Sequence, residues 1–298
     1  LGYHIKYLYY FFARRDVLQK RISYGDMNPN DIIYLIKPDF QNGVEGLLSL
    51  VYRQLLYIAM AQKNGYIPYV DWKNYKTQYY DGKNNVWEYF FKQPSNLTEN
   101  EVYESKNVYI SGWTFKTIDP EGLFEAKVFA DKRIREKSSK MLCEHINFSA
   151  EVLHIVNQEA EKLQIEKCIG VYIRGTDYVK LKPSGEYVQP SVDQMKCKIR
   201  EFESKYNAPI FLVTEDGDIF DELKSEFGEI IKIVYVLSKP EVLEKDKKLR
   251  GQKYLAKMIL LSRCRYLITS ITQGSKFSYI LNNGKYLDEY DFDLGLYS

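Results

Sequence analysis

Histidine and cysteine are both scarce in this sequence of 298 residues, and neither is clustered. The three histidines are His4, His145 and His154. The four cysteines, which form no CxxC or Cys/His spacing, are Cys143, Cys168, Cys197 and Cys264. We therefore expect neither a zinc site nor a catalytic triad built on histidine. Dispersed cysteines are typical of free thiols in a reducing compartment rather than of a disulfide framework.

The sequence also lacks long apolar runs and an excess of one charge. No stretch approaches the ~20 apolar residues that a membrane-spanning helix needs, and no signal peptide with a cleavage site is found. Lysine and arginine number 42 against 40 aspartates and glutamates, a balance that does not favour a nucleic-acid partner. We expect a cytoplasmic protein. Residues 3–22 alternate aromatic and basic side chains, which suits either peripheral contact with the inner face of a membrane or a packed terminal helix.

Two phosphate-binding signatures are missing as well. Neither GxGxxG nor GxxxxGK[ST] occurs, which argues against a dinucleotide-dependent dehydrogenase and a P-loop NTPase. Tyrosine, in contrast, is abundant, with 27 residues against 15 phenylalanines. Its ring with a polar tip suits the stacking of sugars as well as the edge of an ordinary core.

The second half of the chain alternates helical periodicity with short apolar runs. The expected helices cover residues 149–164, 190–206, 216–227, 251–264 and 275–283. The expected strands cover residues 167–173, 209–214, 230–236 and 265–269. Strands and helices that alternate in this way indicate βαβ units and a doubly wound parallel sheet.

The first half begins in the same manner. Its expected strands cover residues 31–38, 66–72 and 107–111, and its expected helices follow a Gly-rich turn within 42–65 and lie around 121–144. Residues 73–91 have no clear period, and the aromatic side chains from Tyr75 to Phe91 suit either acceptor contact or packing. The length of the chain accommodates two α/β domains, which we place at residues 1–148 and 149–298.

Ligands of open parallel sheets bind beyond the carboxyl ends of the strands, and three segments place polar residues there. In the first segment, Arg174, Thr176 and Asp177 follow the strand at 167–173. The planar guanidinium of Arg174 can donate to two phosphate oxygens at once, which a lysine cannot match. The alternative is that Arg174 and Asp177 only pair with each other.

In the second segment, Asp216 and Asp218 follow the strand at 209–214. Their DxD spacing is used by many sugar-transferring enzymes to hold a divalent metal and a nucleotide diphosphate. We favour the other interpretation, in which these carboxylates cap the helix that follows.

In the third segment, a turn with Ser275, Lys276 and Ser278 follows the strand at 265–269 and begins the last helix. Backbone amides and both hydroxyls are expected to point into one crevice, which would form an anion site. The alternative is an ordinary helix cap by Ser275.

These segments resemble peptides of the α-1,2/α-1,6/protein O-fucosyltransferase superfamily. GVYIRGTDY at 170–178 is similar to its HxRxxD peptide, and IFLVTED at 210–216 is similar to its second peptide. KMILLSRCRYLITSITQGSKFSYILNNG at 257–284 is similar to the third. GVEGLLSLVYRQLLYIAMAQKNGYIPYVDW at 43–72 looks like the first Gly-rich passage of these enzymes, so the resemblance runs in order over residues 33–290.

The resemblance implies a GT-B fold, with two Rossmann-like lobes facing a cleft. It places the nucleotide sugar on the C-terminal lobe and the acceptor mainly on the N-terminal lobe. The implied activity is inverting transfer of L-fucose from GDP-fucose to a hydroxyl of a glycan acceptor, as in polysaccharide biosynthesis. No metal or other cofactor is expected, and the expected partners are the nucleotide-sugar donor and the glycan acceptor.

The same resemblance assigns roles to residues. Arg174 takes the place of the arginine that binds the diphosphate, and Tyr172 that of the family's histidine. Candidates for the base that accepts the proton of the acceptor are Asp177 and Glu186, with Glu45 a third. The candidate substrate-binding residues are Tyr172, Thr176, Asp216, Ser275, Lys276, Ser278, Gly43 and Gly46.

Gly175 stands where many members of the superfamily carry a second arginine. One positive charge on the diphosphate is therefore missing, for which Lys276 or Arg250 can compensate. Two other functions fit the sequence. One is a metal-dependent transferase that holds a UDP-sugar with Asp216 and Asp218. The other is a non-catalytic nucleotide- or glycan-binding module on the same fold.

Overall fold

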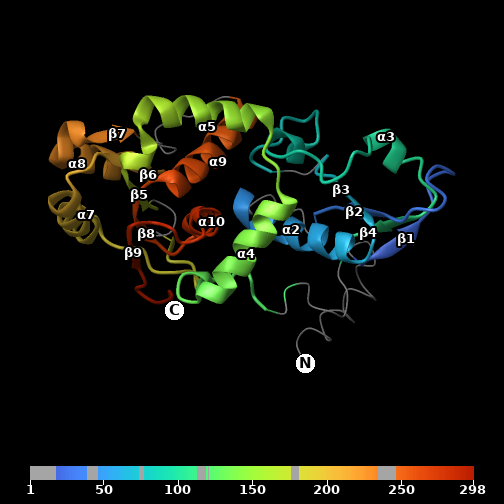
Figure 1. Cartoon of the computed structure of the whole chain (residues 1–298), viewed down its shortest axis with the longest axis horizontal. Coiled ribbons are helices and arrows are strands. Elements are labelled where there is room, and N and C mark those ends of the chain that lie inside the picture. Colours follow the sequence, from blue (N-terminus) through green and yellow to red (C-terminus); the bar gives the residue numbers. More distant parts are fainter. Residues whose placement is uncertain are drawn as a thin grey trace. The chain divides into compact units, whose positions relative to one another are not determined.

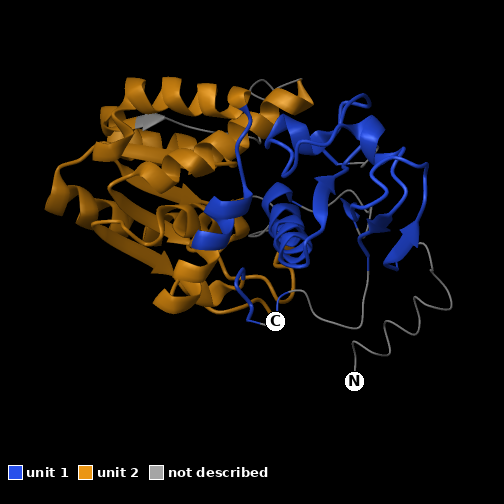
Figure 2. Cartoon of the chain, turned by 45° about the vertical axis from the view of Figure 1, so that its right-hand side comes forward, with its two compact units in different colours: residues 1–124, 140–149 blue, residues 125–139, 150–298 orange. Residues whose placement is uncertain are grey.

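A computed structural model describes residues 18–38, 46–73, 77–112, 119, 121–175, 181–233 and 246–298. Two compact units make up the chain (Figure 2): residues 1–124 with 140–149, and residues 125–139 with 150–298. Each unit contains parallel strands connected through helices, so the predicted α/β class is confirmed. The predicted boundary at residue 148 and the roles assigned to the two domains stay predictions.

In the described part of the first unit, four strands form a sheet in the order β1-β4-β2-β3. They are β1 (Lys20–Ile22), β2 (Ile33–Ile36), β3 (Ile67–Val70) and β4 (Val108–Ile110). Strand β2 is parallel to both of its neighbours, whereas β1 pairs antiparallel with β4. All four residues of β2 are buried, as expected for the central strand of a covered sheet. The sequence predicted β2, β3 and β4 but not β1.

The connection from β2 to β3 runs through helix α2 (Leu47–Lys63), whose buried face is almost entirely apolar. It begins after Gly46, in extended conformation, and ends at Asn64, followed by Gly65 with a positive φ of 70°. A glycine in this conformation is the usual way to stop a helix. The described part of the unit also contains the 3-10 helix η2 (Val86–Tyr89) and the short α3 (Glu99–Val102).

The aromatic insert packs into the first unit. Trp87, Phe90 and Phe91 are buried, and Trp87 meets the ring of Trp72 edge-on at 5.3 Å. Of the two interpretations of Tyr75 to Phe91, the structure therefore shows packing for residues 86–91, while residues 74–76 lie outside the described part.

In the described part of the second unit, five parallel strands lie in the order β7-β6-β5-β8-β9. The strands are β5 (Ile169–Ile173), β6 (Ile210–Thr214), β7 (Ile231–Ile233), β8 (Tyr266–Ser270) and β9 (Asp288–Phe292). Residues of β5 and β6 are buried throughout, because helices cover both faces of the sheet. The sequence did not predict β9.

The helices of this unit follow the predicted alternation (Figure 1). Within the described ranges they include α5 (Ala150–Leu163), α7 (Val192–Tyr206), α8 (Gly217–Phe227), α9 (Lys247–Arg263) and α10 (Gln273–Asn282), with 3-10 turns η3 (Ala126–Val128), η4 (Ile165–Lys167) and η5 (Gly228–Ile230). Met195 and Ile199 of α7 and Leu223 of α8 pack on one face of the sheet with Val171. On the other face, α9 packs against both α5 and α10.

Helix α4 (Lys132–His145) occurs in both units, because residues 125–139 belong to the second and 140–149 to the first. The helix predicted around 121–144 is shorter than expected, because it begins only at Lys132 and the 3-10 turn η3 precedes it. Across the described ranges, no helix is both long and apolar enough to cross a bilayer. Most of the aromatic and basic stretch at 3–22 lies outside those ranges.

Candidate functional site

The order of the strands leaves a switch point in the second sheet. From β5 the chain proceeds through α7 to β6 and on to β7 on one side, whereas β8 and then β9 lie on the other side of β5. The chain continues from β5 toward β6 and from β8 toward β9, on opposite sides of the sheet, so the switch point lies between the carboxyl ends of β5 and β8. Ligands of doubly wound sheets bind at this position. Arg174 follows β5, and helix α10 begins shortly after β8.

Arg174 is held at this edge by an ion pair with Glu215. Its Nε lies 2.9 Å from Oε1 of Glu215, and both side chains are partly buried. Glu215 directly follows β6, and Ile173 pairs with Thr214 in the sheet, so the register places the two charged residues next to each other. The alternative of a pair between Arg174 and Asp177 involves a residue outside the described ranges.

Gly175 is packed against the first turn of α8. A Cβ at this position would lie 2.5 Å from Cβ of Asp216 and 2.8 Å from Cδ1 of Ile219. No side chain fits there without a shift of the helix start or of the strand end. Any residue larger than glycine at position 175 would therefore displace the start of α8, and Gly175 brings the backbone close to Asp216.

We expect Gly175→Ala to lower the free energy of unfolding by about 1–3 kcal/mol, because overpacking forces neighbouring atoms apart. Urea denaturation followed by circular dichroism measures this change. Gly46→Ser is the control, since nothing lies within 4 Å of a Cβ at Gly46 and serine is a good helix cap. Equal free energies of unfolding for Gly175→Ala and the wild type would contradict the prediction, because they would show that the start of α8 can shift to make room for a methyl group.

Asp216 caps helix α8, as we favoured from the sequence. Its Oδ1 accepts hydrogen bonds from the backbone N–H of Asp218 at 2.9 Å and of Ile219 at 3.3 Å. Within the described ranges, no group of three or more histidine, cysteine, aspartate or glutamate side chains is placed to hold a metal ion. Oδ1 of Asp216 is thus occupied by the start of α8, as expected for a cap.

Helix α10 begins two residues before the predicted position. Thr272 is its cap and accepts a hydrogen bond from the N–H of Ser275 at 3.1 Å. The hydroxyl of Ser275 accepts from the N–H of Thr272 at 2.9 Å and donates to the carbonyl of Ser270 at 2.6 Å. Ser275 is therefore the third helical residue of a capping box and not the cap itself.

The hydroxyl of Ser278 is buried too and donates to the carbonyl of Met258 at 2.8 Å, which joins α10 to α9. The expectation that the hydroxyls of Ser275 and Ser278 point into one crevice is therefore wrong: both are buried and bonded to backbone groups. Lys276, also buried, lies in the first turn of the same helix.

Tyr172 is buried where β5 meets α10. A Cβ at Gly274 would lie 3.0 Å from the Tyr172 hydroxyl oxygen and 2.9 Å from Sδ of Met258. The missing side chain of Gly274 thus lets the tyrosine ring pack against the helix start. Tyr172, Arg174 and the first turn of α10 flank the same switch point.

The loop with Glu186 is attached to this edge through its neighbours. Ser270, at the carboxyl end of β8, donates a hydrogen bond to the side-chain oxygen of Gln189. The backbone carbonyl of Glu186 accepts from the N–H of Tyr297 at 2.8 Å, while the residue itself is exposed. Of the other predicted residues, Thr176, Asp177, Gly43 and Glu45 lie outside the described ranges, and Gly46 precedes α2.

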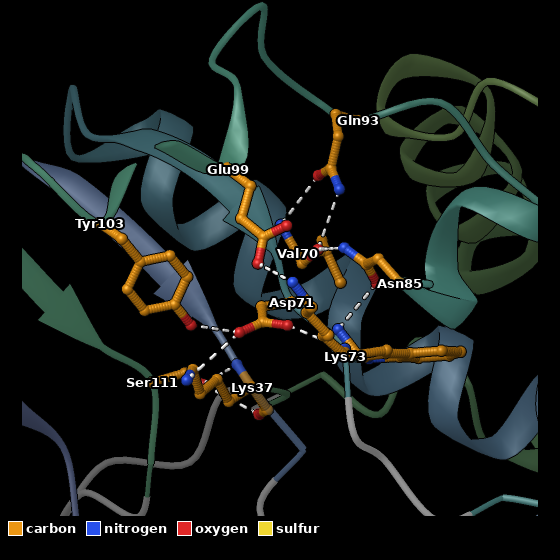
Figure 3. A network of polar contacts seen from close by, with 10 residues as sticks. Lys37, Val70, Asp71, Lys73, Asn85, Gln93, Glu99, Tyr103 and Ser111 are labelled. Carbon is orange, nitrogen blue, oxygen red and sulfur yellow. Dashed lines mark hydrogen bonds and ion pairs between the residues drawn. The ribbon is translucent and has the colours of Figure 1, made fainter. Parts of the chain in front are cut away.

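The first sheet carries a second polar cluster that the sequence did not reveal (Figure 3). Lys37, Asp71 and Ser111 directly follow β2, β3 and β4, so the three carboxyl ends bring them together. Nζ of Lys37 lies 3.2 Å from Oδ2 of Asp71, and Oγ of Ser111 accepts from the N–H of Lys37 at 2.8 Å. Lys37, Asp71 and Ser111 become neighbours only through the order of the strands in the sheet. Their spacing along the chain therefore could not predict the cluster.

Tyr103 completes this cluster. Its hydroxyl donates to Oδ2 of Asp71, and its ring lies 5.2 Å from Nζ of Lys37. Burial, together with the hydrogen bond to the Asp71 carboxylate, raises the pKa of the Tyr103 hydroxyl well above its ordinary value. The phenol thus stays protonated and remains a donor.

A third polar group lies in the second unit. The hydroxyl of Tyr279 donates to Glu289 of β9 and accepts a 3.3 Å hydrogen bond from Arg135. Burial, reinforced by the charge of Glu289, raises the pKa of Asp291 to about 7. Because Asp291 pairs with Thr269, this carboxyl lies near the carboxyl end of β8.

No family model matches the sequence, and no curated protein matches it. Solved structures do match. Fucosyltransferase NodZ from Bradyrhizobium aligns with a TM-score of 0.53 at 15% identity, over 84% of this chain and 93% of that chain. POFUT1 in complex with GDP aligns with a TM-score of 0.53 at 10% identity, over 90% of this chain and 100% of that chain. NodZ α-1,6-fucosyltransferase soaked with GDP-fucose gives a TM-score of 0.52 at 15% identity, over 84% and 92%.

At these identities the similarity shows the fold. The expectation that the chain folds like fucosyltransferases, with two Rossmann-like units, is confirmed.

Proposed function

We propose that the chain is an inverting glycosyltransferase that transfers L-fucose from GDP-fucose to a hydroxyl of a glycan acceptor without a metal. The observation that carries this proposal is the switch point of the second sheet. There, Arg174 follows the end of β5 and helix α10 begins after β8, so both lie at the edge of the sheet where doubly wound folds bind ligands. The solved structures with the same fold include GDP and GDP-fucose complexes, which favours this donor.

Two positive features suit the departing diphosphate. Helix α10 directs its N-terminal amides and the positive end of its dipole toward the edge of the sheet. Arg174 offers a planar set of N–H donors, and Glu215 fixes the Nε side of the guanidinium. When the bond between sugar and phosphate breaks, negative charge grows on the diphosphate. Donors fixed in advance therefore stabilise the transition state more than the ground state.

The acceptor hydroxyl must lose its proton as it attacks from the opposite face. We keep Asp177 and Glu186 as candidates for the base, and an exposed carboxylate such as Glu186 can approach a substrate with little desolvation. In this proposal Lys276 supplies the second positive charge, and Tyr172 and Asp216 shape the nucleotide side. The proposed partners are a nucleotide sugar and a glycan acceptor of cytoplasmic polysaccharide biosynthesis.

A panel of GDP, UDP, CDP and dTDP in thermal denaturation, with and without EDTA, tests the donor. We expect GDP to stabilise most, by ~2.7 kcal/mol at a concentration of a hundred times its Kd. EDTA should change nothing. A larger shift with UDP that EDTA abolishes would contradict the proposal and favour the metal-dependent transferase.

The second candidate function is a non-catalytic nucleotide-binding module. The observation that favours it is the packing of Gly175, which leaves no room for a second arginine. Release of GDP from GDP-fucose separates the two candidates. Binding of GDP without any turnover, with a glycan mixture or with water as the acceptor, would establish the module.

A further inference from the structure

The switch point of the first sheet lies between β2 and β4. From β2 the chain crosses through α2 to β3 on one side, and β4 later joins the other side of β2. Ser111 connects β4 to the end of β2 at this switch point. Its Oγ accepts a hydrogen bond from the N–H of Lys37 at 2.8 Å and donates one to the carbonyl of Lys37 at 3.1 Å. Lys37 is therefore anchored by its backbone at the position where an open sheet binds ligands.

The side chain of Lys37 contacts Asp71 and Tyr103, which fix its orientation (Figure 3). Its ammonium lies 3.2 Å from Oδ2 of Asp71, and the Lys37 side chain is 37% exposed whereas that of Asp71 is 7% exposed. Asp71 in turn accepts from the N–H of Lys73 at 2.8 Å and from the Tyr103 hydroxyl. An ammonium has three N–H donors, so a pair with one carboxylate leaves donors for a ligand.

An aromatic surface lies beside this ammonium. The rings of Tyr24 and Tyr103 are 5.0 Å apart at 57°, and Tyr24 is 37% exposed. A pyranose has an apolar face that stacks on such rings and hydroxyl oxygens that accept from an ammonium. The charges of Lys37 and Asp71 cancel, which favours a neutral ligand over a phosphate or carboxylate.

We propose that Lys37, Tyr24 and Tyr103 form a binding site for a neutral pyranose. Lys37 donates to the hydroxyl oxygens of the sugar, the tyrosine rings contact its apolar face, and Asp71 is a positioning residue for Lys37 and Tyr103. The identification of this sugar as the acceptor rests on the proposed function. The binding of a sugar at this site is independent of the proposed function.

Saturation-transfer NMR with methyl glycosides of galactose, glucose, mannose and N-acetylglucosamine tests the site on the full chain. We expect at least one glycoside to show transfer to its ring protons and Lys37→Met to weaken its affinity at least ~10-fold, which corresponds to ~1.4 kcal/mol. Lys73→Met is the matched control. It removes the same charge from a side chain that is 41% exposed, but Lys73 pairs with Glu99 at 2.7 Å.

The two lysine variants must be compared at equal folding, which thermal denaturation checks. Tyr24→Ala provides a second variant on an exposed side chain and should also weaken the affinity. The proposal is overturned if no glycoside binds the wild type. Equal weakening in Lys37→Met and Lys73→Met, or competition by inorganic phosphate at the concentration of the glycoside, would overturn it too.

Thermal denaturation of the same samples with GDP distinguishes a failure of the sugar site from a failure of the proposed donor. Lys37→Met should retain the full GDP shift, because Lys37 belongs to the first unit and Arg174 to the second. A wild type that binds a glycoside through Lys37 but not GDP would refute the proposed function and leave the sugar site standing. The reverse pattern would refute the sugar site alone.

Discussion

Arg174→Ala lowers kcat by about 10²- to 10³-fold in our account, the loss that follows removal of one fixed donor from a developing oxyanion. The guanidinium is held at the switch point by Glu215, so its donors cost little reorganisation when charge develops on the diphosphate. Arg174→Lys should recover only part of the rate, because an ammonium cannot donate two parallel hydrogen bonds. The measurement is steady-state release of GDP from GDP-fucose.

Arg200→Ala is the control for this prediction. Arg200 also forms an ion pair with a glutamate of the second unit, Glu226, but its side chain is exposed. Its removal should leave kcat within a factor of about two, because exposed pairs contribute little. If Arg174→Ala retained kcat to within a few fold while it remained folded, Arg174 would not contact the leaving group.

The second large effect concerns the stability of the chain at different pH values. The pKa of Asp291 is about 7 in the folded state, raised by burial and by the charge of Glu289, against about 4 in an unfolded chain. Between these two values the folded state holds a proton that the unfolded state has lost. The contribution to stability is therefore complete below about pH 4 and disappears as the pH rises through 7.

Asp291→Asn should remove this dependence, because an amide replaces the protonated carboxyl at every pH. Three pKa units at about 1.4 kcal/mol each correspond to ~4 kcal/mol, so the variant gains up to about that amount over the wild type at pH 8. Urea denaturation at pH 5, 6, 7 and 8 measures the difference. Asp26→Asn, on an exposed residue of the first unit whose charge does not act on Asp291, is the control. A difference between Asp291→Asn and wild type that stays constant over this range would contradict the account.

The sequence predicted most of the elements of the second sheet, because β5, β6 and β8 are apolar runs between amphipathic helices. It missed β9, whose sequence DEYDF holds three acidic residues among five and follows the pattern of a loop. The partners of these acidic residues, among them Tyr279 and Arg135, come from other elements. It also missed β1, all of whose residues are exposed.

The location of Arg174 could be predicted, since a charged residue after a buried strand must lie at the edge of the sheet. Its ion-pair partner could not, because Glu215 becomes a neighbour only when β6 pairs with β5. The directions of the Ser275 and Ser278 hydroxyls could not be predicted from the sequence either. Their direction depends on the carbonyls of Ser270 and Met258, which the fold brings to them.

A crystal structure of the chain with GDP tests the central claim most directly. We predict diphosphate oxygens within hydrogen-bonding distance of the Arg174 guanidinium and of the backbone amides in the first turn of α10. A structure in which GDP binds elsewhere, while Arg174 contacts only Glu215, would contradict the account.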